Sequence, residues 1–376
     1  MRDLTRRALI AALPLSLASC DLVEASFDNR SSSKKATPLP SVGEFVRFAD
    51  PLTETAVVRL TSPSSASLLP DYRNRFISVK ERFLVFSSDR GGQMSPFRLD
   101  LRSGSLTSLG TTAQLLPQSL CLDNSGRSLY CVDGGSLKEI ALGNKRSHTL
   151  AEEVSVFSLG ESRTIAFVRN ARVYLLGRNE PVAEQPASWC ALRPGDSGCL
   201  FGREQEGQAE FWYVGLGTQR TAPILLVRGD ISNPVWSPDG ASILFLSRGP
   251  SGGSEIHELN PETRQERKIS GVTQFAAFSP NHDGSVFVGA SSSKAQPVIV
   301  LLLRSLRREL TLCEHRASHP AAVSPVFSPD SRRVYFQSDS EGKSAIYSVN
   351  VELIVEPANS GNSSSSSRTV NSPVAV

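Results

Sequence analysis

Histidine and carboxylate side chains gather in one short segment, residues 314–319, and give it metal-ligand chemistry. The segment reads Glu314-His315-Arg316-Ala317-Ser318-His319. Imidazole and carboxylate groups bind divalent transition ions, so His315 and His319 are candidate metal ligands. Two histidines do not hold such an ion without several carboxylates beside them, so an exposed loop is the alternative interpretation.

Three arginines, Arg75, Arg248 and Arg316, are candidates for binding an anionic ligand. Guanidinium groups around a central funnel would attract an acidic sugar or another carboxylate. The alternative is that all three are solvated loop residues. The chain contains no Gly-x-Ser-x-Gly nucleophile elbow, and we assign no catalytic residue.

Four of the six cysteines fall in pairs on the two arms of predicted hairpins. Cys121 and Cys131 form one such pair, and Cys190 and Cys199 form the other. Cross-strand disulfides would join them if the side chains face each other, and buried free thiols are the alternative. Cys313 is left without a counterpart, and none of these residues has zinc-ligand spacing.

Length and charge restrict the classes of function. A chain of 376 residues is long enough for two or three average domains, or for one closed all-β domain. The formal net charge is +3, and the basic residues are scattered, so we expect no nucleic-acid partner. No apolar stretch reaches the roughly 20 residues that span a bilayer.

The first 20 residues have the order of an export signal. Arg2, Arg6 and Arg7 precede a short apolar run, and Leu17-Ala18-Ser19-Cys20 follows it. This pattern resembles a bacterial lipobox, which predicts a signal peptide over residues 1–19 and a lipid on Cys20. An ordinary cleaved signal is the alternative. Asp21 resembles a retention signal and favours the inner membrane over the outer one.

The two ends of the mature chain have the composition of unfolded segments. Residues 20–44 are rich in Ser, Lys and Pro with few aromatic residues, which predicts a flexible tether. Residues 357–376 contain five consecutive serines and no apolar periodicity, which predicts a disordered tail. Residues 45–356 remain for a folded body.

Repeated strand-and-turn patterns fill this body. The clearest copy, 324–350, has three short apolar runs bounded by Pro, Asp and Gly, and six further copies precede it. Units of about 35 to 48 residues with four strands each are typical of the blades of a β-propeller. The last copy lacks a fourth strand, which we expect residues 56–60 to supply by closing the ring. The prediction is an all-β, seven-bladed propeller; a six-bladed ring and a β-sandwich are the alternatives.

Two resemblances to known families follow from these motifs. The Ser-Pro-Asp-Gly turn at 237–240, with its variant at 328–331, resembles the turns of TolB-type propellers. The segments 50–61, 281–289 and 336–347, within 48–352, resemble oligogalacturonate lyase. That resemblance implies a seven-bladed propeller that cleaves unsaturated digalacturonate by β-elimination. It also implies a manganese site made of three His and a Gln, where the metal acidifies a C–H bond next to a carboxylate.

This chain departs from the lyase pattern at the implied metal ligands. One expected His falls on or near Ala277. A His-Pro-His run is replaced by Ser318-His319-Pro320-Ala321, or by Ala322 and Ser324 in an ungapped alignment. The Gln position falls on Arg316 or His319. We therefore expect no cofactor, and manganese only if the site has been rebuilt.

Taken together, the sequence predicts a lipid-anchored bacterial envelope protein that faces the periplasm. Its propeller would act as a binding module, without catalysis, for a protein partner or an anionic oligosaccharide. One alternative is a divergent lyase that acts on uronate oligosaccharides. Another is an envelope assembly factor comparable to TolB.

Overall fold

The structure is a computed structural model, and it describes residues 44–217, 221–249, 252–271 and 273–354. The described residues all belong to the second of the two units into which the chain divides, Ala36–Val376. The predicted signal peptide, Cys20, the tether up to residue 43 and the predicted tail all lie outside the described residues. Among the described residues, no helix has the length and hydropathy needed to cross a membrane.

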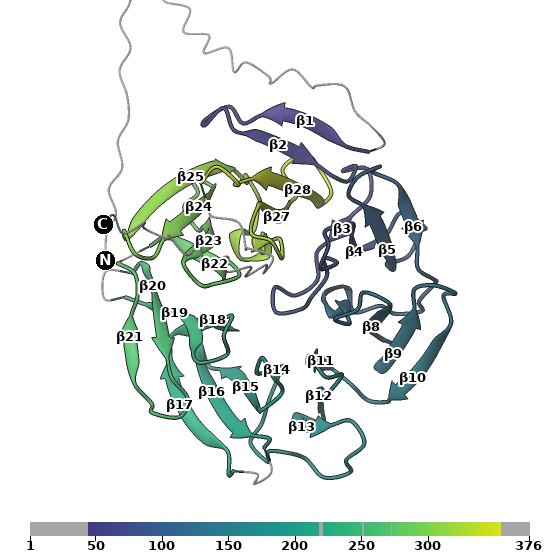
Figure 1. The fold of residues 1–376 in the computed structure, drawn as a ribbon, viewed down its shortest axis with the longest axis vertical. Coiled ribbons are helices and arrows are strands. Elements are labelled where there is room, and N and C mark those ends of the chain that lie inside the picture. The colour runs from purple at the N-terminus through teal and green to yellow at the C-terminus, as the bar shows by residue number, and fades with distance from the viewer. Residues whose placement is uncertain (1–43, 218–220, 250–251, 272, 355–376) are drawn as a thin grey trace, which may run out of the picture. The chain divides into compact units, whose positions relative to one another are not determined.

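Seven antiparallel sheets follow one another around a ring in the second unit (Figure 1). Blades 1 to 3 contain β3 (Ser67–Leu68), β4 (Phe83–Ser88), β5 (Ser95–Asp100) and β6 (Leu106–Ser108); β7 (Cys121–Leu122), β8 (Ser128–Asp133), β9 (Ser136–Ala141) and β10 (Ser147–Ala151); and β11 (Val156–Leu159), β12 (Ile165–Arg169) and β13 (Arg172–Leu175). Blades 4 and 5 contain β14 (Trp189–Leu192), β15 (Gly198–Gln205), β16 (Gln208–Gly215) and β17 (Ile224–Gly229); and β18 (Ile231–Trp236), β19 (Ile243–Arg248), β20 (Ser254–Leu259) and β21 (Glu266–Lys268).

Blades 6 and 7 complete the ring. They contain β22 (Phe275–Pro280), β23 (Val286–Ser291), β24 (Val298–Leu303) and β25 (Arg308–Glu314); and β26 (Val326–Phe327), β27 (Arg333–Ser338), β28 (Ala345–Asn350), β2 (Ala56–Arg59) and β1 (Val46–Ala49). The described residues also include two 3-10 turns, η1 (Pro117–Ser119) and η2 (Pro320–Ala322). The predicted seven-bladed propeller is confirmed, and the six-bladed ring and the sandwich are wrong.

Each blade buries both of its faces, because side chains alternate along its strands. In β27, Val334 and Phe336 pack in a cluster with blade 6, whereas Tyr335 packs in a cluster with blade 1. Successive side chains of a strand therefore pack alternately against the two neighbouring blades. This explains why the middle strands read as continuous apolar runs in the sequence.

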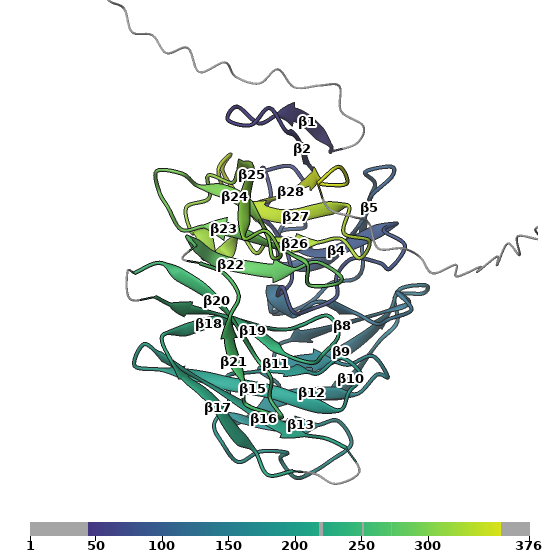
Figure 2. The same cartoon turned by 60° about the vertical axis from the view of Figure 1, so that its left-hand side comes forward.

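The ring closes between the two ends of the described chain, as predicted. β2 pairs antiparallel with β28, with Val57 opposite Val349 and Arg59 opposite Tyr347 (Figure 2). The backbone ladder continues beyond β2, because the amide of Leu60 donates to the carbonyl oxygen of Ile346 at 2.7 Å. Closure pairs the outer edge of β28, which would otherwise present unpaired backbone groups.

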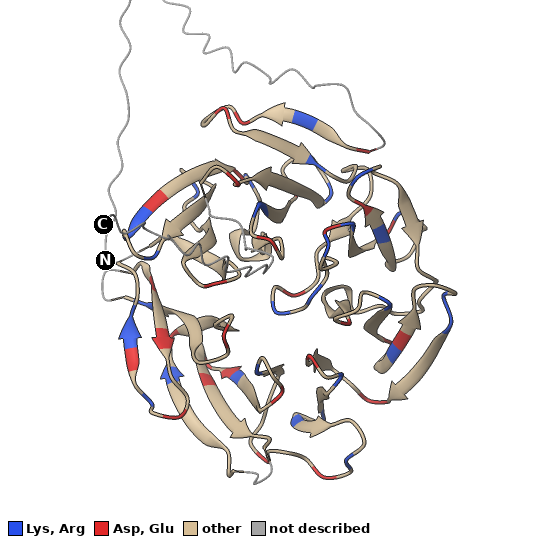
Figure 3. Cartoon of the chain, viewed as in Figure 1, with Lys and Arg blue, Asp and Glu red and all other residues tan. Residues whose placement is uncertain are grey.

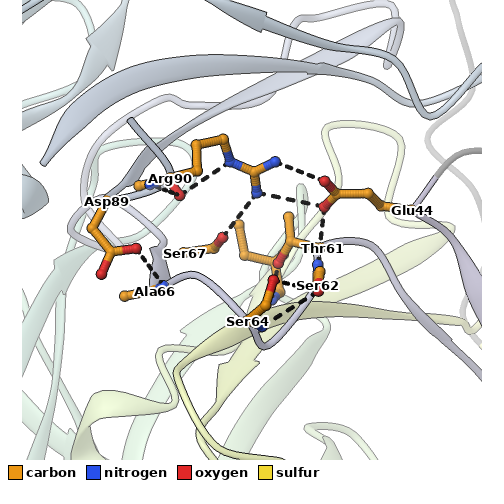
Figure 4. Close-up of polar contacts among 10 residues, drawn as sticks. Glu44, Thr61, Ser62, Ser64, Ala66, Ser67, Asp89 and Arg90 are labelled. Carbon is orange, nitrogen blue, oxygen red and sulfur yellow. Dashed lines mark hydrogen bonds and ion pairs between the residues drawn. The ribbon is translucent and has the colours of Figure 1, made fainter. Parts of the chain in front are cut away.

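Polar contacts fix the chain that enters the ring beside blade 1 (Figure 4). The Arg90 guanidinium donates to the Glu44 carboxylate at 2.8 Å, and the amide of Ser62 donates to the same carboxylate at 2.9 Å. The Asp89 carboxylate accepts a hydrogen bond from the amide of Ala66 at 2.8 Å. These bonds hold the connection between β2 and β3 against the β4–β5 turn.

Two sheets depart from the predicted four strands. Blade 3 has three strands, because the segment after β13 contains Pro181 and Pro186, which cannot donate ladder hydrogen bonds. It keeps a single bridge, between Val173 and Ala183. The closing sheet has five strands, because β1 folds back on β2 with Phe48 opposite Val57.

Replacement of Val57 by Ala tests the importance of ring closure. Val57 is 2% exposed and packs in the cluster between blades 6 and 7, so truncation should lower the free energy of unfolding by about 2 kcal/mol. Leu52→Ala is the matched control, because Leu52 is 60% exposed in the same part of the chain. Urea unfolding measures both variants; an equal loss in the two would contradict the assigned role of β2.

Candidate functional site

A cavity of about 280 Å³, the axial cavity, lies where the first strands of blades 5, 6 and 7 face blade 1. Polar and apolar side chains contribute to its wall. It is lined by Tyr72, Asn74, Arg75, Phe76, Ile77, Val235, Trp236, Pro238, Ser279, Pro280, Asn281, His282, Val326, Phe327, Ser328 and Pro329. This volume is close to the lower end of the range for small-molecule sites.

The turns that follow β18 and β26 are fixed by their own serine and aspartate side chains. The Ser237 hydroxyl donates to the Asp239 carboxylate at 2.6 Å and accepts from the amide of Ser242 at 2.9 Å. Ser328 donates to Asp330 in the same way at 2.7 Å. Such local bonds hold the turn in one conformation, so this wall of the axial cavity is preorganised.

The segment 69–76 of blade 1, the axial loop, extends into the middle of the ring between β3 and β4 (Figure 1). Its start is held by blade 7, because the amide of Leu69 donates to the side-chain oxygen of Gln337 at 2.7 Å. The Tyr72 hydroxyl donates to the carbonyl oxygen of Pro234 in blade 5 at 3.0 Å. The axial loop therefore crosses the ring and joins blades that are far apart in sequence.

Acidic and basic residues both lie on the axial loop (Figure 3), and Asp71 neutralises the charge of Arg73. Arg73 donates two hydrogen bonds of 2.8 Å to the carboxylate of Asp71, and its guanidinium lies 5.0 Å from the ring centre of Trp189. Burial opposes the charged form of Asp71, but Arg73 outweighs it and lowers the pKa of Asp71 below its usual value. An arginine that is partly buried and paired in this way has a structural role.

Of the three candidate arginines, Arg75 is the one that lines the axial cavity. Its guanidinium donates to the carbonyl oxygen of Leu122 in blade 2 at 3.2 Å. This bond uses one of five donors and leaves the positive charge without a carboxylate partner among the described residues. Arg75 is therefore available to an anion in the cavity.

Arg248 and Arg316 lie on the other side of the ring from the Ser-Pro-Asp turns, because successive turns of an antiparallel blade alternate between its two sides. Arg248 pairs with Asp230 at 2.7 Å, and Arg316 pairs with Glu314. Both pairs are solvent-exposed at the arginine. The structure thus does not bring the three arginines together in one funnel.

His315 and His319 have different surroundings, because His315 is buried and His319 is exposed. His315 is 1% exposed; its Nε2 donates to the carbonyl oxygen of Ser291 at 3.1 Å, and its Nδ1 accepts from the amide of Ala317 at 3.1 Å. Both ring nitrogens are therefore used by the backbone. His319 is exposed and precedes η2. In the described part of the chain, no three His, Cys, Asp or Glu side chains form a group that could hold a metal ion.

Two residues that line the axial cavity, His282 and Tyr72, were not predicted from the sequence. His282 lines it and contacts the Ser331 hydroxyl through Nδ1 at 2.8 Å, whereas the sequence Asn281-His282-Asp283-Gly284 by itself is typical of a turn. Tyr72 was also missed. The unusual length of the connection from Leu68 to Phe83 was the available signal, because the matching turn of blade 5 is much shorter.

For Cys121 and Cys131 the structure favours buried free thiols over a disulfide, because the two side chains point to opposite faces of blade 2. Cys121 packs toward blade 3, whereas Cys131 packs toward blade 1. Across the hairpin, Cys121 lies opposite Tyr130. Both are buried free thiols, and burial raises the pKa of Cys121 to about 11.

Cys190 and Cys199 pack on the same face of blade 4, but they are also free thiols. They are diagonal neighbours, since Cys190 lies opposite Phe201 and Cys199 lies opposite Leu192. A hydrogen bond with Cys190, together with burial, raises the pKa of Cys199 well above its usual value. In this structure the alternative of buried free thiols therefore describes this pair as well.

Comparison with known proteins supports the resemblance to oligogalacturonate lyase. No family model matches the chain. An oligogalacturonide lyase of Pectobacterium atrosepticum is 24% identical over 186 residues, which are 41% of this chain. The chain spans about half, 47%, of the length of that relative.

Solved structures extend the likeness to the whole ring. An oligogalacturonate lyase in complex with manganese superimposes with a TM-score of 0.74 at 20% identity, over 84% of this chain and 98% of its own. The oligogalacturonate lyase of Vibrio parahaemolyticus gives 0.70 at 19% identity over the same shares. TolB from Acinetobacter baumannii also matches, at a TM-score of 0.42. At 20% and 19% identity, the structural likeness to the two lyases shows the fold.

The manganese of that complex gives a test of the donor set in this chain. The position where a family histidine is expected carries Ala277, which is buried and has no donor atom in its side chain. His315 has both nitrogens bound to backbone groups, and Arg316 is a cation. These residues do not fit a manganese ion. The chain resembles oligogalacturonate lyases in its fold and differs from them at the implied ligands.

The burial of His315 should make the stability of the protein depend on pH. Burial lowers the pKa of His315 below its usual 6.5, so the unfolded chain takes up this proton more readily than the folded one. Stability should therefore fall as the pH drops below about 6.5, by at most about 1.4 kcal/mol per pH unit for this group. His315→Gln should reduce that loss between pH 7.5 and about 5.5. The exposed His148→Gln serves as control in urea unfolding; identical pH slopes for His315→Gln and the unmodified protein would contradict the prediction.

Proposed function

We propose that this chain is a binding propeller of the bacterial cell envelope that holds an acidic sugar oligomer at its axial cavity without cleaving it. In this proposal, a lipid on Cys20 anchors the protein, and the propeller faces the periplasm. The observation that carries the proposal is the Arg75 guanidinium, which lines the cavity and has no carboxylate partner among the described residues. An arginine in this state favours a carboxylate-bearing ligand.

The lining of the axial cavity supports recognition of a sugar. Trp236 and Tyr72 supply aromatic surface, while Asn281, His282 and Arg75 supply polar groups. Aromatic walls with a few polar groups are the usual composition of a small-molecule site. The likeness to an oligogalacturonide lyase suggests oligogalacturonate as the first ligand to examine.

The absence of cleavage in the proposal rests on the donor set and on the axial loop. β-Elimination next to a carboxylate needs a group that stabilises the developing negative charge and a base that takes the proton. Ala277 and the backbone-bound His315 do not supply the family's metal ligands. The axial loop also occupies space at the centre of the ring, and Tyr72 bonds it to Pro234.

Replacement of Arg75 tests this proposal by binding. Arg75→Ala should weaken the binding of purified oligogalacturonate about tenfold, because it removes a charge-assisted hydrogen bond. Arg248→Ala is the matched control, since Arg248 lies on the other side of the ring and pairs with Asp230. Isothermal titration measures both. A protein that binds no oligogalacturonate, or an equal effect of the two substitutions, would contradict the proposal.

The lipid anchor is tested separately in cells. Cys20→Ser removes the thiol that would carry the lipid, so the protein should move from the membrane fraction to the soluble envelope fraction. Ser26→Ala, in the predicted tether, is the control and should leave the protein in the membrane fraction. Immunoblots of separated fractions give the result. Membrane association of the Cys20→Ser variant would show that the proposed anchor is wrong.

A further inference from the structure

A second cavity, the blade 7/1 cleft, lies between the closing sheet and blade 1, away from the axial cavity. Its volume is about 320 Å³. Arg47, Arg102 and Arg333 line it together with Tyr335 and Ser348. Three arginines line this one cavity, whereas basic residues are scattered over the rest of the chain.

The strand register explains why these residues face the same space. Arg47 lies opposite Val58, Val58 lies opposite Ser348, and Ser348 lies opposite Tyr335. Side chains in register across neighbouring strands point to one face of a sheet. Arg333 precedes Tyr335 by two residues and shares that face. Ring closure by β1 and β2 therefore brings Arg47 next to residues that come almost 300 positions later.

None of the three arginines has an acidic partner within the described parts of the chain. All three are exposed, and no ion pair found there involves them. Arg102 reaches the cleft from the turn between β5 and β6 of blade 1. By contrast, Arg73 and Arg90 are matched with carboxylates nearby. Positive charge is thus left unneutralised at this cleft.

The one carboxylate in the lining, Glu81, does not neutralise it. Burial and a hydrogen bond shared with Asp330 raise the pKa of Glu81 to about 7. Near neutral pH, Glu81 therefore carries a proton much of the time. It also accepts from the backbone amide of Asp330 at 3.4 Å, so it faces the neighbouring turn.

Tyr335 supplies an independent indication that the cleft binds a ligand. Its side chain is 1% exposed and lies in the core between blades 7 and 1. Within the described residues, no group forms a hydrogen bond with its hydroxyl. Buried tyrosine hydroxyls usually have a partner, so this donor at the wall of the cleft is available to a bound molecule.

We propose that the blade 7/1 cleft binds a small anion through a carboxylate or phosphate group. Arg333, Arg102 and Arg47 would surround the anion, and the Tyr335 hydroxyl would donate a hydrogen bond to it. Guanidinium groups match the paired oxygens of both kinds of anion. A volume of about 320 Å³ is close to the lower end of the range for small-molecule sites.

Titration of the full chain with two probes, inorganic phosphate and galacturonate, tests the proposal and identifies the anion. We expect saturable binding of at least one probe, weakened at least tenfold by Arg333→Ala and at least fivefold by Tyr335→Phe. Tyr335→Phe keeps the ring and removes only the hydroxyl, so the fold is retained. Binding of phosphate alone indicates a phosphorylated ligand, and binding of galacturonate alone indicates a carboxylated one.

Two controls separate this site from other sources of binding. Arg308→Ala removes an exposed arginine of blade 6 and should leave the affinity unchanged, whereas Arg75→Ala identifies any binding of galacturonate at the axial cavity. A loss on Arg75→Ala alone would assign the binding to the axial cavity. The proposal is overturned by that result, by no saturable binding of either probe, or by unchanged binding in both Arg333→Ala and Tyr335→Phe.

Discussion

The pairing of β2 with β28 is the constraint on which the rest of the structure depends. A propeller has no central element, and each blade buries its faces only against its two neighbours. Without β2, the backbone groups along the outer edge of β28 would be unpaired. Blade 7 would also lose part of its contact with blade 1. The hydrogen bond from Leu60 to Ile346 and the packing of Val57 hold this joint. Residues of blades 1 and 7 line both cavities, and the pairing of β2 with β28 holds these two blades together.

The distribution of charge distinguishes structural arginines from those available to ligands. Arg73 lies on the axial loop, where Asp71 neutralises its charge and the Trp189 ring lies close to its guanidinium, so it stabilises the loop. Arg75, two residues later, bonds only to a carbonyl oxygen and keeps its charge for the cavity. The basic character of a site thus depends on the pairing of each guanidinium, which residue counts do not reveal.

Local patterns in the sequence were sufficient for the fold. Apolar runs such as 334–336 between Pro-Asp and Gly turns indicate strands, and the shortage of one strand in the last copy indicates closure by residues 56–60. Contacts between distant residues were not predictable in this way. Cys121 and Cys131 share a hairpin, but the strand register places them on opposite faces. His315 carries a ligand-type side chain, but Ser291, 24 residues earlier, uses one of its nitrogens. The path of the axial loop depends on Pro234, 162 residues after Tyr72.

Product analysis tests directly whether the propeller binds oligogalacturonate without cleaving it. The full chain is incubated with oligogalacturonate and manganese, and the recovered oligomers are analysed by mass spectrometry. We expect the chain lengths to be unchanged after many times the period in which an active lyase consumes its substrate. Shortened oligomers with an unsaturated end, which are absent when heat-denatured protein is used, would contradict it and would show that the lyase chemistry persists on a different set of residues.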